Sequence, residues 1–453
     1  MSGPFRVIEG GRTGEPTPGL LVVGASEVVT LDGGVRRGPD QADVGRLLTQ
    51  DPSGPDAPSV AAWEGRIVAV GPRASVEAGL EADGFPLGRF ARIDASGGSV
   101  TPGLIDPHTH LLFAGTREDE LVMRQRGASY LDILEAGGGI LSTVAATRAA
   151  SEGQLLAHGR RWLDEMLGHG VTTVEAKSGY GLDLETELRL LDVAHRLGQE
   201  GPVDVVPTWL GAHAVPLEYR SRPDGTEAFV RSLIDEQLPG IAAQGRARFA
   251  DVFCETGVFT ADQSRRILEA ARGFGLEPRL HADELAPSGG AELAADLQAA
   301  SADHLATPSK AGIRAMAAAA DGGNAVVATL LPITTWFLLK DHHAPARAFI
   351  DAGVPVAIGT DFNPGTSPAP NLPLAMSFAC TNLGMSPDEA LTAVTINAAR
   401  ALSLEEEIGS LEPGKVADLV IWRVPSTMQI PYYPGADLVR TVIKRGRIVY
   451  ERQ

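Results

Sequence analysis

The sequence has very little cysteine, since Cys254 and Cys380 are the only two in 453 residues. Two cysteines cannot build the disulfide framework of a small secreted domain. The amino-terminal residues 1–15 also lack the apolar segment of a signal peptide. Both absences favour a cytoplasmic location.

Long apolar runs and positive charge are scarce as well. The longest apolar run, residues 325–339, is interrupted by Pro332 and is shorter than the roughly 18 residues that span a bilayer. Lysine and arginine total 39 against 57 aspartates and glutamates, which gives a formal net charge of −18. Such a surface repels phosphate, so we expect neither a membrane nor a nucleic acid as a partner.

The composition that is present fits a globular protein. Apolar residues make up 44% of the chain and charged residues 21%. The 52 glycines and 31 prolines fall below the roughly 25–30% that marks a low-complexity chain. The length accommodates one α/β barrel of roughly 250 residues with a smaller domain beside it.

Both ends of the chain carry short strand patterns. They lie at 20–30 and 64–72 near the amino end, and at 414–422 and 439–453 near the carboxyl end. The polar, turn-rich residues 33–59 predict a long surface loop. Two strand-rich ends around a different middle predict one small β domain built from both termini.

The middle of the chain alternates apolar strand patterns with helical, alanine- and leucine-rich stretches. The strand candidates lie at 103–110, 172–179, 204–213, 249–255, 277–284, 301–305, 324–331 and 354–361. Repeated strand–helix units of this number predict an α/β fold, a parallel (β/α)8 TIM barrel. We place the barrel at residues 101–400 and assign 1–100 and 401–453 to the β domain.

Metal-binding side chains cluster at the ends of these strands, the rim where barrel active sites are built. His108 and His110 close the first strand, and residues two apart on a strand point to the same side. Two imidazoles arranged in this way can chelate one divalent ion. His281, His304 and Asp361 end the fifth, sixth and eighth strands. The set predicts a metal site at the rim.

Glu284 follows His281 by three residues, just past the end of the strand. A carboxylate there can reach a water molecule at the metal and shuttle its proton, as hydrolysis requires. A structural alternative is a helix amino-terminal carboxylate stabilised by the helix dipole.

Several motifs together give the chain a family resemblance. VTPGLIDPHTH, HADE, ADHL, GTD and GKVADLVIW resemble the amidohydrolase superfamily of metal-dependent hydrolases, over nearly the whole chain. Within that superfamily the chain is similar to the imidazolonepropionase family of histidine degradation. The narrower motifs are EAKSGYGL at 175–182, LGAHAVP at 210–216, GTDFNPGT at 359–366, AGGGI at 136–140 and FAGTRE at 113–118.

The resemblance implies a barrel with a small β-sandwich domain and one divalent metal ion, zinc or iron. It implies metal ligands at His108, His110, His281 and Asp361. The catalytic residues would be Glu284, His304 and Asp361. The residues facing 4-imidazolone-5-propanoate or its product, N-formimidoyl-L-glutamate, would be Arg117, Tyr180, His213, Glu284, Asn363, Gly365 and Thr366.

The residue types agree with these implied roles. The substrate carries a carboxylate, and Arg117 can offer a bidentate guanidinium to it in an acidic protein. We also expect a homodimer, because symmetric dimers are the commonest soluble assembly. Residues 41–60 depart from the family pattern, and we expect them to lie far from the chemistry.

Alternatives stay open at this point. Lys177 lies on the second strand, whereas the carboxylated lysine of some superfamily members belongs on the fourth, and Glu255 is a weaker candidate for a second metal. A deaminase acting on a nucleobase or related heterocycle would use a similar metal set. A non-catalytic barrel scaffold is disfavoured because all the metal-binding side chains are present.

Overall fold

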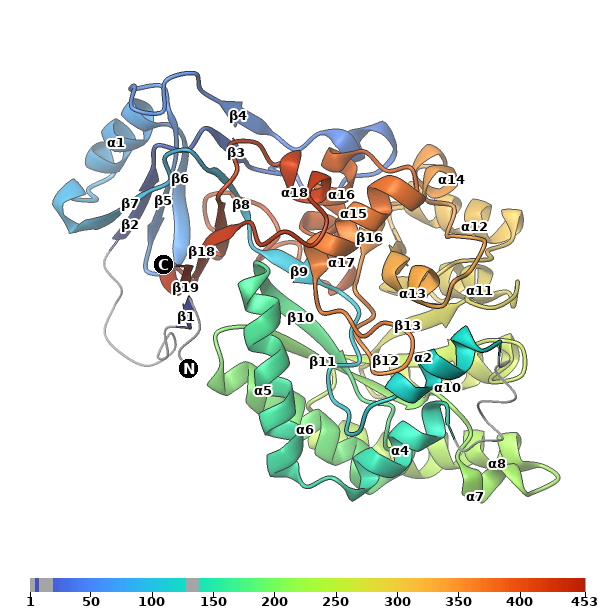
Figure 1. Cartoon of the computed structure of the whole chain (residues 1–453). Coiled ribbons are helices and arrows are strands. Elements are labelled where there is room, and N and C mark those ends of the chain that lie inside the picture. Colours follow the sequence, from blue (N-terminus) through green and yellow to red (C-terminus); the bar gives the residue numbers. More distant parts are fainter. Residues whose placement is uncertain (1–4, 8–18, 128–137, 453) are drawn as a thin grey trace.

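The computed structural model describes residues 5–7, 19–127 and 138–452 (Figure 1). Its centre is an eight-stranded sheet in which every neighbouring pair runs parallel, in the order β16-β15-β14-β13-β12-β11-β10-β9. The strands are β9 (Leu104–Asp106), β10 (Val171–Lys177), β11 (Asp204–Ala212), β12 (Phe249–Cys254), β13 (Glu277–Ala282), β14 (Ser301–His304), β15 (Val327–Leu330) and β16 (Val356–Ile358). Each lies within the sequence range predicted for it or overlaps that range, so the predicted (β/α)8 barrel is confirmed.

The helices surround the sheet (Figure 1). They are α2 (Glu118–Gln125), α4 (Ile140–Ala149), α5 (Glu152–Gly168), α6 (Leu184–Glu200), α7 (Leu217–Arg220), α8 (Gly225–Ser232), α9 (Leu238–Gln244), α10 (Ala261–Gly273), α11 (Gly290–Asp296), α12 (Lys310–Asp321), α13 (Pro332–Phe337), α14 (Ala346–Asp351), α15 (Leu372–Asn382), α16 (Pro387–Ala393) and α17 (Ile396–Ala401). A π-helical turn, Leu233–Gln237, joins α8 to α9. Capping boxes at Ser151, Thr260 and Ser386 fix where α5, α10 and α16 begin.

Two further sheets form from the two ends of the chain. One has the order β1-β19-β18-β17-β8-β3-β4 and the other the order β6-β5-β2-β7. Their strands are β1 (Phe5–Val7), β2 (Gly19–Val23), β3 (Glu27–Val29), β4 (Arg46–Leu48), β5 (Pro58–Trp63), β6 (Arg66–Pro72), β7 (Phe90–Asp94), β8 (Ser99–Pro102), β17 (Leu419–Trp422), β18 (Val439–Lys444) and β19 (Arg447–Arg452). The helix α1 (Arg73–Ala82) and the 3-10 turn η2 (Leu87–Arg89) lie beside the second sheet, whereas the 3-10 turn η1 (Gly38–Ala42) packs against α14 and α16, and α18 (Gln429–Tyr432) against α15.

These two sheets share one apolar core. Buried side chains of one sheet, such as Val22 and Ile67, pack in the same cluster as Val100 and Ile421 of the other. Burial of apolar surface between the sheets therefore confirms the predicted sandwich built from both termini. The domain limits at residues 100 and 400 stay a prediction.

The predicted surface loop at residues 33–59 is wrong in part. The segment contains η1 and β4, and β5 begins at Pro58. Gln41 is fully buried, and its amide group hydrogen-bonds the backbone nitrogen and oxygen of Val356 at 3.1 Å each. Tertiary contacts of this kind are invisible to a local polarity pattern. The contact is to the first residue of β16, at the end of that strand opposite Asp361.

Among the described residues, no helix is both long and apolar enough to cross a membrane. Cys254 and Cys380 are both free thiols, as expected from their number.

Candidate active site

The carboxyl ends of the barrel strands bring together the side chains predicted to bind metal. Three overlapping groups have their ligand atoms within 4.8 Å of one another: His108 with His110 and Asp361, His108 with His281 and His304, and His110 with His213 and His281. All of these side chains are buried. Five histidines from the ends of four barrel strands thus meet Asp361 at one point, although they are far apart in the sequence.

The His-x-His segment lies beyond β9 rather than on it, which corrects the local prediction. β9 ends at Asp106, and Thr109 instead bridges Phe362 after β16. The backbone nitrogen of His110 donates to Phe362, and that of Asp361 donates to His108, both at 2.9 Å. This short parallel pairing closes the barrel. It also places His108 and His110 beside Asp361.

Four ligand atoms converge in this cluster. Oδ1 of Asp361 lies 3.5 Å from Nε2 of His108 and 3.4 Å from Nε2 of His110. Nε2 of His281 lies 3.3 Å from Nε2 of His110. The other carboxylate oxygen of Asp361 accepts a 2.7 Å hydrogen bond from Thr334, which sequence reasoning missed.

The donor set fits a divalent cation. Within the described part of the chain, Nε2 of His108 is buried without a hydrogen-bond partner, a costly arrangement for a polar atom unless an ion satisfies it. Three imidazoles and one carboxylate are ligands suited to zinc or iron. Asp361 adopts a left-handed backbone with φ 53, and such conformations collect at functional sites.

His213 and His304 lie in the same cluster. The ring of His213 stacks on that of His110, with centroids 4.8 Å apart, and its Nδ1 lies 3.1 Å from the carbonyl oxygen of Gly179. Burial lowers the pKa of both His213 and His304 well below the usual value, so both are neutral at pH 7. A neutral imidazole can donate one hydrogen bond to a ligand.

Glu284 lies at the edge of the cluster. Its carboxylate is 3.6 Å from Nε2 of His304. Burial, reinforced by the nearby charge of Asp361, raises the pKa of Glu284 to about 8. A carboxyl group titrating near neutrality has the property expected of a general acid and base.

The residues predicted to bind substrate flank the metal cluster on two sides. Tyr180 is buried, with its ring centroid 5.8 Å from that of His110 and 5.4 Å from that of His213. Arg117 directs Nε and Nη2 at the carboxylate of Glu120, each at 2.9 Å. The Nε and Nη2 atoms of this guanidinium are therefore already paired with Glu120, which the sequence did not reveal.

Asn363, Gly365 and Thr366 form one tight turn after Asp361. Oδ1 of Asn363 accepts from the backbone nitrogens of Gly365 and Thr366 at 2.9 and 2.8 Å. A β-carbon added at Gly365 would lie 2.1 Å from Nη1 of Arg117, so only glycine allows this approach. The turn and the arginine are thus packed directly against each other. The AGGGI motif at 136–140 lies outside the described residues at its first two positions.

A buried ionic network below the metal cluster was missed from the sequence. It consists of side chains with no exposed surface: Glu175, Lys177, Asp251, Arg279 and Asp303. Asp303 lies 2.7 Å from Nδ1 of His108, and Asp251 lies 3.1 Å from Nδ1 of His281. Alternation along β10, β12, β13 and β14 points these residues into the barrel, but the partners depend on strand register.

Electrostatics keep this network charged. Despite the opposing effect of burial, neighbouring cations hold the pKa of Asp303 and of Asp251 well below the usual range. Neighbouring carboxylates raise the pKa of Lys177 despite its burial. Lys177 is therefore a paired ammonium. Glu255 instead accepts hydrogen bonds from Leu285 and Ser288 and holds the loop that carries Glu284.

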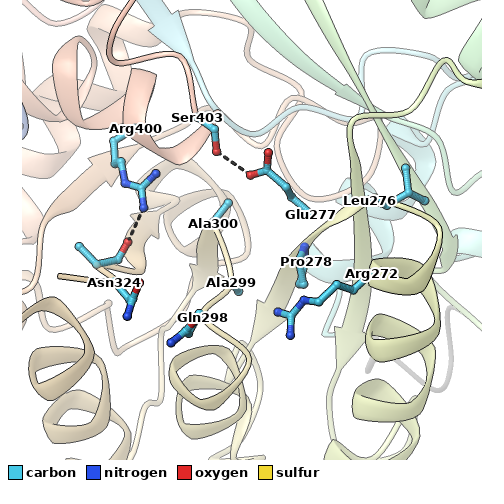
Figure 2. Close-up of a pocket in the computed structure, with 12 residues that line it drawn as sticks. Arg272, Leu276, Glu277, Pro278, Gln298, Ala299, Ala300, Asn324, Arg400 and Ser403 are labelled. Atoms are coloured by element: carbon cyan, nitrogen blue, oxygen red, sulfur yellow. Dashed lines mark hydrogen bonds between the residues drawn. The ribbon is translucent and has the colours of Figure 1, made fainter. Parts of the chain in front are cut away.

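A cavity of about 430 Å³ lies at the opposite end of the barrel (Figure 2). Its walls come from the amino ends of β13, β14 and β15. Ser403 donates to Glu277 at 2.7 Å, and Arg400 donates to the carbonyl of Ala325 at 3.3 Å. None of the predicted site residues lines it. Its polar groups connect the starts of the strands to α17 and to the segment after that helix.

The chain is similar to known proteins over most of its length. The model of the amidohydrolase family matches residues 114–450. The chain is 56% identical over 392 residues to an imidazolonepropionase of Geobacillus kaustophilus, covering 85% of this chain and 88% of the relative. It is 47% identical over 436 residues to an imidazolonepropionase of Alkaliphilus metalliredigens, covering 96% of this chain and 98% of the relative.

Solved structures share the fold at much lower identity. A zinc-bound adenosine deaminase from Xanthomonas campestris matches with a TM-score of 0.65 and 20% identity, covering 95% of this chain and 92% of that chain. Guanine deaminase from E. coli matches with a TM-score of 0.67 and 14% identity, covering 96% and 99%. At these identities the likeness concerns the fold alone.

Proposed function

The chain belongs to the amidohydrolase family and, within it, to the imidazolonepropionases, and from this premise we propose that it hydrolyses the cyclic amide of 4-imidazolone-5-propanoate. Water adds to the ring carbonyl carbon, the ring carbon–nitrogen bond breaks, and the nitrogen leaves with a proton. The product is N-formimidoyl-L-glutamate, an intermediate of histidine degradation. The observation that carries the proposal is 47% identity to an imidazolonepropionase along 96% of the chain.

We propose that one divalent ion, zinc or iron, is held by His108, His110, His281 and Asp361. The convergence of their ligand atoms and the unpartnered Nε2 of His108 among the described residues support this set. A bound ion of this kind polarises a carbonyl group and lowers the pKa of a water molecule.

The protein side chains supply the proton transfers and hold the ring. Glu284, whose pKa is raised to about 8, takes a proton from water and returns it to the leaving ring nitrogen. His304 and His213, both neutral, are placed to donate to the oxygen on which negative charge develops. Asp361 assists as an additional proton acceptor. These roles follow from the side chains around one point.

The propanoate tail requires a cation in a chain with a net charge of −18. We propose that Arg117 reads this carboxylate with Nη1, while Glu120 holds Nε and Nη2 of the same guanidinium, which lies against Gly365. Tyr180 and the turn at Asn363, Gly365 and Thr366 complete the pocket.

A homodimer in the cytoplasm is also proposed. The dimer is inferred from the prevalence of symmetric dimers, and the location from the scarcity of cysteine. Light scattering of the purified protein at several concentrations measures the oligomer, and a monomer at all of them contradicts it.

The decisive experiment compares two reactions on one preparation. Ring opening is followed by the loss of imidazolone absorbance, and deamination by ammonia release from guanine, cytosine and adenosine. We expect ring opening alone. Ammonia release without ring opening would instead support a deaminase, the chemistry of the two structural neighbours of similar shape.

A further inference from the structure

Two of the proposed metal ligands are anchored from behind by carboxylates. Oδ2 of Asp303 lies 2.7 Å from Nδ1 of His108. Oδ1 of Asp251 lies 3.1 Å from Nδ1 of His281 and also accepts from the backbone nitrogen of that histidine. A carboxylate on Nδ1 fixes the tautomer and the ring orientation, so that the Nε2 lone pair points away from it. In both histidines, Nε2 therefore points towards the metal cluster.

A single ammonium group joins the two carboxylates. Nζ of Lys177 lies 2.7 Å from Oδ2 of Asp251 and 3.6 Å from Oδ2 of Asp303. It also lies 2.7 Å from Oε1 of Glu175, which contacts neither of these histidines. The lysine, the aspartates and the glutamate all have side chains with no exposed surface, so solvent cannot replace these contacts.

We propose that Lys177 is a positioning residue, which holds Asp251 and Asp303 so that His281 and His108 present converging Nε2 atoms before any metal arrives. The inference rests on the metal site of the proposed function. It assigns a role to the lysine of the EAKSGYGL motif that is separate from metal bridging. Lys177 touches neither the ion nor the substrate.

The physical argument concerns what remains when the ammonium is removed. Glu175, Asp251 and Asp303 would then share Arg279 as the nearby cation within the described residues. Buried carboxylates without enough positive charge repel each other, so Asp251 and Asp303 rotate away from their histidines. This rotation loosens the anchor on Nδ1. Ligand orientation then has to be established during metal binding, which lowers affinity.

The test measures zinc affinity of the apo-protein by competition with a chromophoric chelator. Lys177→Met keeps the length of the side chain and removes the charge. We expect its affinity for Zn²⁺ to fall about 10–100-fold, the usual effect of losing such outer contacts. Wild-type affinity in Lys177→Met overturns the inference.

A matched control is available in the β-sandwich. Lys444 on β18 is also buried and pairs with Asp204 at 2.7 Å and with Asp418. Lys444→Met should lower the unfolding temperature as Lys177→Met does, because each removes an ammonium group from a buried carboxylate, but it should leave zinc affinity unchanged. An equal loss of zinc affinity in both variants would mean that Lys177 acts through the stability of the fold and does not position the ligands.

A double variant separates positioning from charge balance and covers a failure of Lys177→Met to fold. Lys177→Met with Glu175→Gln removes one charge of each sign and leaves both aspartates and both histidines unsubstituted. We expect the fold to recover while zinc affinity stays low. Recovery of wild-type affinity would overturn the inference. Failure of the wild-type protein to bind zinc or iron would instead overturn the proposed metal site.

Discussion

At the scale of single residues, Glu284 combines burial, a raised pKa and proximity to the metal cluster. Glu284→Gln keeps the shape and the hydrogen bonding but removes the base. We expect kcat to fall by roughly 10²–10⁴, the usual contribution of a positioned acid and base. Single-turnover ring opening, with metal content determined on the same sample, measures the effect.

The control for this prediction is Glu255→Gln. Glu255 is buried close by, but its hydrogen bonds go to the loop of Leu285 and Ser288. Glu255→Gln should lower the free energy of unfolding but should change kcat little. Near wild-type turnover in Glu284→Gln would mean that Asp361 alone handles the protons. Loss of metal in that variant would make Glu284 a ligand.

Arg117 tests which part of the substrate is recognised. Arg117→Met keeps much of the length and removes the charge, so substrate binding should weaken by roughly 1.5–3 kcal/mol, the range for a charge-assisted hydrogen bond. An analogue without the tail carboxylate should bind more weakly to wild type and almost equally to the variant. Titration calorimetry of both ligands measures this. Equal discrimination by both proteins would refute the assignment.

The proposed metal ligands are the residues that a sequence predicts best. His108 and His281 carry unusual chemistry at recognisable strand ends, so they stand out without any structure. Thr334 and Asp303 do not, because threonine and aspartate are common and their partners lie far away in the chain. The hydrogen bonds to Asp361 and to His108 require knowledge of which strands are neighbours.

At the scale of elements, the turn after β16 couples the metal ligand Asp361 to Arg117. Gly365→Ala would place a β-carbon 2.1 Å from Nη1 of Arg117. The guanidinium must shift, so we expect kcat/KM to fall by roughly 10–100-fold, since small misplacements of positioning groups are costly. Metal content should not change.

Gly153→Ala is a suitable control for the turn. A β-carbon at Gly153 meets no atom within 4 Å, and the residue lies in the first turn of α5. Its steady-state kinetics should match those of wild type. Unchanged kinetics in Gly365→Ala as well would show that the turn and Arg117 move apart when substrate binds.

The barrel strands were predictable as elements because each is a short apolar run bounded by turn signals. The exact ends of these strands were less predictable. β9 stops at Asp106, and the segment through Thr109 is held by the bridge to Phe362 and by hydrogen bonds to Glu175 and Lys177 of β10. The segment at 33–59 was misjudged in part because a buried side chain within it, Gln41, is polar and is satisfied by the backbone of Val356. Local hydrophobicity cannot indicate such a contact.

At the scale of the whole molecule, the two ends of the barrel have different roles. The carboxyl end gathers histidines and carboxylates from many strands into one cluster. The cavity at the amino end is lined by residues that hydrogen-bond between the starts of the strands and α17 or the segment after it (Figure 2). This division is typical of barrel enzymes, in which function occupies one rim and stability the other.

Metal binding should therefore stabilise the entire barrel. Because the proposed ligands come from the segment after β9, from β13 and from the segment after β16, an ion would join parts of the chain that separate on unfolding. Free Zn²⁺ at about 100 times its dissociation constant should add about 2.7 kcal/mol to the free energy of unfolding. Chelation followed by thermal unfolding should show a lower melting temperature, restored by zinc or iron.

His108→Ala connects this stabilisation to the proposed ligand set. The variant should lose most bound metal and most activity together, and its melting temperature should no longer respond to added Zn²⁺. Elemental analysis of wild type should give about one equivalent, since one cluster of ligand atoms supplies one tetrahedral site. Near two equivalents would contradict a single-ion site. Full metal content in His108→Ala would remove His108 from the ligands, even though its Nε2 faces Asp361 at 3.5 Å.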